Sequence, residues 1–424
     1  MGVMENMLQD IPCPKMFKVR QHFDETKIED VDAAIRQQLS KPEIDSTIKK
    51  GMRIALTCSS RGIDNLAFIM RSVVRYCQEK GAEPFIVCAM GSHGNACAEG
   101  QLEIARTKGV TEEYCGCPVT ATMETVKIGE TEDGTPVHME KDAAAADGII
   151  VIGRVKAHSC FTGPYESGIM KMMAIGLGKQ YGAETCHNRG FGHMAEMIPQ
   201  FAHCVLKNCK ILFGLALMEN AYDKLYRVES MTPAEIPVKE PELLEDTKAH
   251  MARIIPGSCD VLVVDYIGKE FSGDGMDPNI VGRGPQPYKV GNFKEQMIAV
   301  LALTDASHGN AQGVGCADIT TRRLVDKIDY EAIYINSFTS CNSHSAPIPI
   351  TMNSDKLAIQ AAIKFCVDVD KSPEKLRVIR IQNSLAMSEI ELSEAYLDEV
   401  KNYPDMEVIS DLHEMPFDEN GNLF

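Results

Sequence analysis

Short apolar runs alternate with helical patterns along the first half of the chain. Segment 63–81 carries apolar residues three and four positions apart and ends at a glycine, while segment 95–109 begins at Asn95, a candidate N-cap, and ends at Gly109. The apolar runs between these segments are interpreted as buried strands: 53–60, the start of 84–94, 148–155 and 210–219. This rhythm predicts an α/β fold with a mainly parallel sheet and helices on both faces.

A second series of strand-like segments follows a break near residues 252–260, where Pro and Gly follow a long polar helix. The predicted strands of this series are 260–268, 330–337 and 375–384. The predicted helices between them are 293–303 and 354–367. We therefore predict two α/β domains, 1–256 and 257–404, with the tail 405–424 returning to the first. The cofactor and the active site are expected in the cleft between the two domains.

The composition is that of a globular protein with an ample core, because the 424 residues are 44% hydrophobic and 24% charged. The formal net charge of -17 disfavours nucleic acid and anionic membrane surfaces as partners, since phosphate groups need a basic binding surface. No apolar run approaches the roughly 20 residues that a membrane-spanning helix needs. The first residues lack the basic start and apolar core of a signal peptide, so a cytoplasmic protein is expected.

The fifteen cysteines are interpreted as reduced thiols. Their number is odd, and most lie within apolar strand or helix patterns. Cys115 and Cys117 form a close pair, but a metal site would need two further ligands nearby. We therefore expect a loop with incidental cysteines at this position.

Two loops at the ends of predicted strands carry candidate chemistry. Arg61 follows the first strand and opens a helix, where an arginine can bind a carboxylate or phosphate, although a surface salt bridge explains it equally well. Ser92 and His93 stand between glycines that let a ligand approach the backbone. His93 is a candidate acid or base near neutral pH, or a histidine that only bonds its own turn.

A third loop, 157–190, holds a lysine between two histidines. His158 follows the predicted strand 148–155, and Lys171 lies among methionines, where burial would lower its pKa and make it a nucleophile. The alternative is a lysine that extends along an apolar face to solvent. His187 lies in a polar loop, where a histidine taken alone more often has no catalytic role.

The second predicted domain offers ligand groups of its own. The glycine-rich loop 268–284 contains Lys269 and Arg283 as candidate substrate-binding residues, and His308 repeats the Ser-His-Gly-Asn setting of His93. Motifs of several other enzyme classes are missing from the sequence: G-x-G-x-x-G after the first strand, G-x-x-x-x-G-K-[ST], G-x-S-x-G and H-E-x-x-H.

Taken in order, these residues resemble the nickel-pincer-nucleotide enzymes, the lactate racemase superfamily. The shared features are an arginine after the first strand, a G-x-H turn after the next strand, a histidine that ends a later strand, and a lysine followed at a matching spacing by a histidine. Segments such as GPYESGIMKM and SGDGMDPN are similar to a subgroup of isomerases distinct from the lactate enzyme.

The resemblance implies a role for each residue. Lys171 would correspond to the lysine that can attach to the cofactor, pyridinium-3,5-bisthiocarboxylic acid mononucleotide. His187 would be the protein ligand of its nickel, in a square plane that suits Ni(II). His93 and His158 would be the acid/base pair. Further residues at the cofactor or substrate would be Arg61 and Ser92.

The activity that the resemblance implies is that of a racemase or epimerase acting on a 2-hydroxy acid or sugar acid. One histidine would take the hydroxyl proton, the hydrogen on carbon would leave as hydride to the cofactor and return to the opposite face, and the other histidine would reprotonate the oxygen. Lactate is a poor candidate, because the motif that holds it is not recognisable here. The loop from His158 to Lys171 is also longer than in the lactate enzyme.

Two other functions stay open on the sequence. The same histidines could hold zinc or iron in a hydrolase or lyase, or the chain could carry a cofactor without catalysis. The partners expected are a small hydroxy acid or sugar acid and, as one option, further copies of this chain in a homo-oligomer; nucleic acid and membranes are not expected.

Overall fold

The computed structural model describes residues 2–285, 291–340 and 342–424. They form two compact units, which we call the first unit (Asp24–Met251) and the second unit (Met1–Phe23 with Ala252–Phe424). Each unit contains a mixed sheet with helices, and most of the strand pairs are parallel. The predicted α/β fold class is therefore confirmed.

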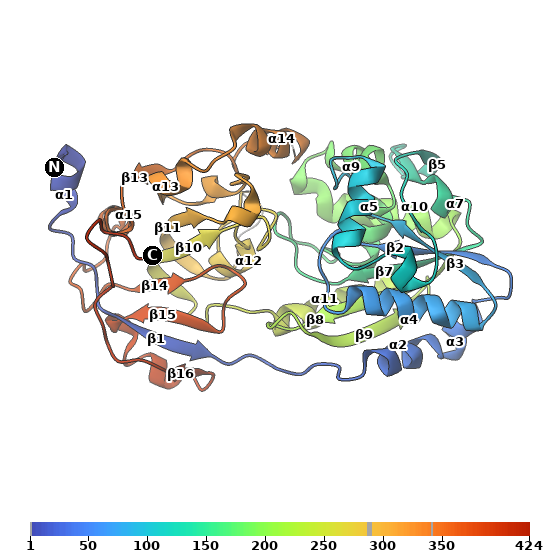
Figure 1. Cartoon of the computed structure of the whole chain (residues 1–424), viewed down its shortest axis with the longest axis horizontal. Coiled ribbons are helices and arrows are strands. Elements are labelled where there is room, and N and C mark those ends of the chain that lie inside the picture. Colours follow the sequence, from blue (N-terminus) through green and yellow to red (C-terminus); the bar gives the residue numbers. More distant parts are fainter. Residues whose placement is uncertain (1, 286–290, 341) are drawn as a thin grey trace. The chain divides into compact units, whose positions relative to one another are not determined.

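The sheet of the first unit has six strands: β2 (Arg53–Cys58), β3 (Glu83–Cys88), β4 (Val119–Thr120), β7 (Gly148–Arg154), β8 (Ile211–Glu219) and β9 (Leu225–Met231). Their order is β4-β3-β2-β7-β8-β9, with β9 antiparallel to β8 (Figure 1). Alternate side chains enter different cores, because Ala55 and Val151 pack on one face and Leu56 and Ile152 on the other. A separate hairpin comprises β5 (Thr125–Glu130) and β6 (Pro136–Glu140).

Helices cover both faces of this sheet. One face packs against α2 (Val31–Leu39), α3 (Pro42–Asp45), α4 (Leu66–Glu79), α5 (Ala98–Thr107) and α6 (Glu112–Cys115). The other packs against α7 (Lys141–Ala144), α8 (Ile169–Lys171), α9 (Lys179–His187), α10 (Met194–Asn208) and α11 (Ile236–His250). A π-helical turn, Met172–Gly176, lies between α8 and α9. The strands and the first helix predicted in this part of the chain are confirmed.

The sheet of the second unit has eight strands: β1 (Met16–Gln21), β10 (Ser258–Ile267), β11 (Lys294–Leu303), β12 (Ile319–Thr321), β13 (Ile350–Met352), β14 (Val378–Ile381), β15 (Glu389–Ser393) and β16 (Met406–Val408). Their order is β13-β12-β11-β10-β14-β15-β1-β16, parallel from β13 to β14 and antiparallel beyond. The helices of this unit are α1 (Val3–Leu8), α12 (Pro278–Val281), α13 (Arg322–Val325), α14 (Tyr330–Ser340) and α15 (Asp355–Phe365).

Two predicted elements of the second unit are of the wrong type. Residues 293–303 were expected to be helical but contain strand β11, and residues 330–337 were expected to be a strand but lie in helix α14. β11 is a central parallel strand whose second half is buried on both faces, so its apolar run lacks the alternation that marks a strand. In α14, Tyr334 and Ile335 are exposed. The strand preference of such residues comes from packing in a buried sheet, so it does not apply at these positions.

The prediction that residues 405–424 return to the first domain is wrong. β16 pairs with β1, and both strands lie in the sheet of the second unit, so the start of the chain also belongs there (Figure 1). These are pairings between the two ends of the sequence, which no local pattern reveals.

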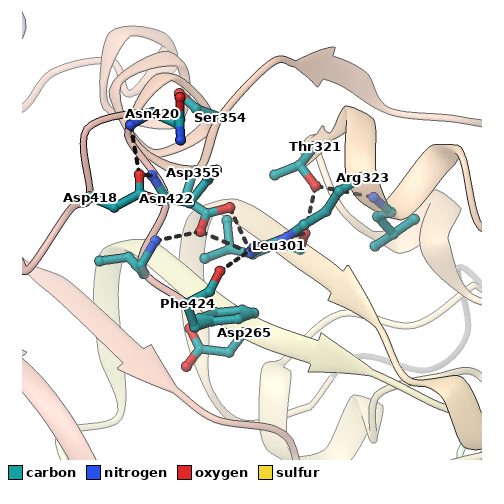
Figure 2. Close-up of polar contacts among 12 residues, drawn as sticks. Asp265, Leu301, Thr321, Arg323, Ser354, Asp355, Asp418, Asn420, Asn422 and Phe424 are labelled. Carbon is teal, nitrogen blue, oxygen red and sulfur yellow. Dashed lines mark hydrogen bonds and ion pairs between the residues drawn. The ribbon is translucent and has the colours of Figure 1, made fainter.

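The last residues of the chain dock on the same unit (Figure 2). The Arg323 guanidinium donates to both Asp355 oxygens at 2.9 and 2.8 Å and to the Phe424 carbonyl at 2.6 Å, and it lies 4.2 Å from the centre of the Phe424 ring. The Leu423 N–H donates to Asp355 at 2.8 Å. These contacts hold the tail beside α13 and α15.

Two further expectations concern membranes and thiols. Among the residues described, no helix is long and apolar enough to cross a bilayer. The described cysteines are all free, and most of them are buried, as expected for reduced core thiols.

Candidate active site

The predicted site residues of the first unit follow three neighbouring strands. Arg61 comes after β2, His93 after β3 and His158 after β7. From β2, the chain first adds β3 and β4 on one side and later β7 and β8 on the other. Open α/β sheets bind ligands beyond the carboxyl ends of their strands, at the point where the strand order changes direction. The three loops therefore lie where this topology favours a ligand site.

The turn that carries His93 is joined to the loop after β2. Ser60, the neighbour of Arg61, has its hydroxyl in short hydrogen-bond contact with His93 Nδ1. The His93 side chain is exposed, and Ser92 beside it is partly buried. The Ser60 hydroxyl can donate to or accept from Nδ1, so this contact links the loops after β2 and β3 in either tautomer of His93.

Glycine is required at position 94 of this turn. Gly94 has a φ of +67°, and a Cβ added there would lie 2.6 Å from the Gly100 carbonyl carbon. Asn95 also has a left-handed backbone. It was predicted to cap the following helix, but it does not. The cap of α5 is Cys97, whose Sγ accepts the Gly100 N–H at 3.3 Å. The prediction was wrong because the turn continues two residues further than the sequence pattern indicates.

The loop after β7 sets the ring of His158. The Cys160 N–H donates to His158 Nδ1 at 3.0 Å, so a neutral ring carries its proton on Nε2. The Phe161 ring packs against the imidazole with 4.4 Å between the ring centres. The neutral His158 ring is therefore held in the tautomer that can give a proton through Nε2.

Glu166, which the sequence analysis did not single out, organises this loop. Its side chain is fully buried, and its carboxylate accepts the His158 N–H at 2.6 Å and pairs with Lys248 Nζ at 2.9 Å. Lys156 and Ser167 pair as an antiparallel bridge at the base of the loop. The signal in the sequence was an acidic residue between turn residues in GPYESG, which is easily taken for a solvent-exposed one.

Lys171 ends α8 at the point where the π-helical turn begins. Burial, with a smaller contribution from the charge of Arg61, lowers the pKa of its ammonium group to about 8, whereas Cys160, Cys186 and Glu166 act in the opposite direction. Its Nζ lies 5.9 Å from the centre of the Phe161 ring. Lys171 is thus close to the loops after both β2 and β7, and it is partly desolvated, as the sequence predicted. π-Helical turns of this kind are frequent at functional sites.

His187 is the last residue of α9, and only its Nδ1 bonds to the helix backbone. Its Nδ1 donates to the Ala183 carbonyl at 2.6 Å, because a carbonyl oxygen can only accept, and Nε2 keeps its lone pair. Burial lowers the pKa of His187, and the charge of Lys171 lowers it further, against the effect of the Ala183 hydrogen bond. A neutral imidazole fixed by a backbone carbonyl is the usual form of a histidine that binds a metal.

A second glutamate outside the predicted set, Glu240, binds the backbone of α8 next to Lys171. Glu240 on α11 accepts the Met170 N–H at 3.0 Å, and burial raises the pKa of its carboxyl to about 8. A Cβ on Gly168 would lie 2.2 Å from Glu240 Oε1, so a side chain there would displace the Glu240 carboxyl. The sequence around Glu240 is rich in acidic residues, which hid its burial.

The candidate substrate residues of the second unit are engaged within that unit. Arg283 donates to Asp318 at 2.7 Å and to Glu295 at 3.0 Å, which is the arrangement of a structural ion-pair network. Lys269 Nζ donates to the Gly273 carbonyl at 2.7 Å and to Asn336 Oδ1 at 2.9 Å. Their role in binding a substrate stays a prediction.

Comparison with known proteins places the site residues in one family domain. Residues 9–198 match the model of the lactate racemase N-terminal domain, and this range includes all the site residues that follow β2, β3 and β7. A search of curated protein sequences found no match.

Two solved structures are similar to this chain at low sequence identity. One is the lactate racemase apoprotein from Thermoanaerobacterium thermosaccharolyticum, with 12% identity, a TM-score of 0.45 and 87% of this chain and 88% of that chain covered. The other is a protein from Thermotoga maritima, with 14% identity, a TM-score of 0.46 and 64% of this chain and 70% of that chain covered. Residues 9–198 of this chain therefore contain a domain of the lactate racemase N-terminal type.

Proposed function

We propose that the protein is a nickel-pincer-nucleotide-dependent racemase or epimerase that inverts a hydroxyl-bearing carbon of a 2-hydroxy acid or sugar acid. The observation that carries this proposal is the proximity of Lys171 to His187, whose pKa the lysine charge helps to lower. One imidazole has its Nδ1 committed to a backbone carbonyl, and the lysine beside it has a pKa lowered to about 8. The neutral imidazole could bind a metal ion, and the unprotonated amine could attack an electrophilic cofactor.

The residues fit such a cofactor. His187 Nε2 would be the protein ligand to nickel, Lys171 Nζ would bond or contact the pyridinium ring, and Arg61 would approach a phosphate or carboxylate. When bound, the cofactor supplies a hydride acceptor. Among the residues described, no group of three or more His, Cys, Asp or Glu side chains is arranged to hold a metal ion. A nickel ion at His187 would therefore need its other ligands from the cofactor.

Two histidines on separate loops suit an inversion. The substrate hydroxyl points to opposite sides in the two stereoisomers, so one base is needed on each side. The Nδ1 atoms of His93 and His158 are engaged by Ser60 and by the Cys160 N–H, respectively. The neutral His158 ring would give its Nε2 proton to the substrate oxygen, and its use as a base would require the Cys160 contact to open and the ring proton to move to Nδ1. His93 would be the partner that takes the hydroxyl proton.

The alternative, a hydrolase or lyase that uses the same histidines around zinc or iron, has less support. A catalytic zinc site usually takes three protein ligands. The described part of the chain offers no such group, and His93, His158 and His187 have different partners.

The proposal is tested with cofactor-loaded protein and a panel of 2-hydroxy acids and sugar acids in deuterated water. The expected result is interconversion of two stereoisomers with the original hydrogen kept at the inverted carbon. Solvent deuterium at that carbon would instead show proton abstraction and would contradict hydride transfer. His93→Ala and His158→Ala should each lower the rate by about 10²–10⁴-fold.

A further inference from the structure

We propose that Lys179 is a positioning residue that fixes the His93 turn against the helical segment carrying Lys171 and His187. Lys179 is the first residue of α9, and His187 is the last. The inference rests on the acid/base role proposed above for His93, and it goes beyond that role by stating how His93 is held in place.

Lys179 is unusual in both its burial and its backbone. Its side chain has 0% relative exposure, although lysine is among the residues least often buried. Its φ is +55°, in the left-handed region that a residue with a side chain enters only where its surroundings enforce it. The fold therefore maintains a strained backbone in order to place this side chain in the interior.

The ammonium group joins the end of β3 to α5. Lys179 Nζ donates to the Cys88 carbonyl at 2.7 Å and makes a short hydrogen bond to Gln101 Oε1. Gln101 is itself fully buried, and its Nε2 donates to the carbonyls of Gly91 and His93 at 2.9 and 3.2 Å. The side chains thus form a chain of contacts from Lys179 through Gln101 to the backbone of His93.

A backbone contact closes the same junction from the other side. Gly176 is the last residue of the π-helical turn. Its carbonyl oxygen accepts the Gly91 N–H at 3.1 Å. A Cβ on Gly176 would lie 2.7 Å from the Ala89 carbonyl oxygen, so the two segments are already in close contact. Lys179 and Gly176 therefore tie the helical segment to the His93 turn at two points.

Loss of the ammonium group should release this turn. The Cys88 carbonyl and the Gln101 side chain would lose a buried donor, and the Gln101 amide would be free to rotate away from the turn. Displacement of a catalytic group by about 1 Å can cost about 10²-fold in rate. A general structural role, by contrast, would lower stability without a specific effect on His93.

Three variants separate these cases. Lys179→Met keeps the length of the side chain and removes its donors. Gln101→Glu keeps an acceptor for Lys179 but loses the amide N–H groups that reach Gly91 and His93. The control is Lys41→Met, since Lys41 is a partly buried lysine whose ion pair with Glu229, at 3.1 Å, lies outside the site.

The first readout is the pH titration of the His93 ring in the metal-free protein, followed by NMR with His250 as the internal reference. Lys179→Met and Gln101→Glu should both shift the His93 resonances and their midpoint, and Lys41→Met should not. If Lys179→Met does not fold, Gln101→Glu decides alone. His93 resonances identical to those of the wild type in the folded variants would overturn the proposal.

The second readout is the kinetics of the cofactor-loaded enzyme. Both site variants should lower kcat by about 10–100-fold with little change in KM, and the pH limb that belongs to His93 should move. Unchanged kcat in both would also overturn the proposal. If the wild type shows no isomerase activity, the proposed function fails, but the titration of His93 still decides whether Lys179 positions it.

Discussion

The surroundings of Lys171 change the chemistry of its side chain. Burial lowers its pKa to about 8 from the ordinary value of 10.5. Roughly a tenth of the amine is therefore unprotonated at pH 7, far more than for an exposed lysine. The nearby positive charge of Arg61 acts in the same direction. A lysine in this state can attack an electrophilic carbon, which an exposed ammonium group cannot do.

The first prediction is that acylation of Lys171 in the metal-free protein follows this pKa. Below pH 8 the ammonium group is protonated and unreactive, and above pH 8 the free amine reacts, so labelling should rise with a midpoint near pH 8. Exposed lysines in the same digest serve as controls, with midpoints near their usual value of about 10.4. Peptide mass spectrometry measures both, and a Lys171 midpoint equal to that of the exposed lysines would contradict the account.

At the scale of elements, the loop between β7 and α8 depends on one buried carboxylate. Glu166 binds the backbone of His158 and the ammonium group of Lys248, which belongs to α11. The loop is rich in turn residues, and this ion pair holds it together with the buried Phe161 ring. The longer connection that precedes Lys171 is therefore a fixed structure and a suitable support for a base.

The second prediction concerns this carboxylate. Glu166→Ala should lower the free energy of unfolding by about 1–3 kcal/mol, because the His158 N–H loses its acceptor and the partly buried Lys248 ammonium group keeps only the exposed Glu245. Glu245→Ala is the matched control, since Glu245 pairs with the same lysine at 2.9 Å but is 74% exposed, and it should change stability by less than about 1 kcal/mol. Urea unfolding measures both. Equal losses in the two variants would refute the role of Glu166.

Helix α8 has a comparable support in Glu240, with a consequence for pH. The folded pKa of this carboxyl, about 8, lies above its ordinary value of 4.5. The stability that the protonated carboxyl contributes is thus complete below pH 4.5 and is lost as the pH rises toward 8.

The third prediction follows from that sign. Glu240→Gln cannot ionise but keeps an oxygen that can accept the Met170 N–H, so its stability relative to the wild type should increase between pH 5 and pH 8. The gain should be on the order of a few kcal/mol. Denaturant unfolding at several pH values measures the difference. A difference that stays constant with pH would show that the wild-type carboxyl is already ionised at pH 5.

At the scale of the whole molecule, the first unit could be predicted far better than the second. β2, β7 and β8 are central strands, and each is followed or preceded by a helix with a clear apolar face, so local pattern and fold agree. In the second unit, the sequence of β11 predicts a helix because its apolar run has no alternation. β1 and β16 enter the sheet through pairings between the two ends of the chain. Pairings over such separations leave no local signal.

The site divides in the same way. His158 and Lys171 could be found from their positions after a strand and within an apolar run. Glu166, Glu240 and Lys179 could not, because acidic and basic residues in turns and helices are usually exposed. Their function depends on burial, which only the folded structure shows.

The most direct test of the proposed function is the nickel content of the protein isolated with its cofactor. The account predicts nickel together with a sulfur-bearing pyridinium nucleotide in the wild type and loss of nickel in His187→Ala, with the fold kept. His193→Ala is the control, since His193 is half exposed and pairs with Glu196. Stoichiometric nickel retained in His187→Ala would contradict the assignment of His187 as the metal ligand.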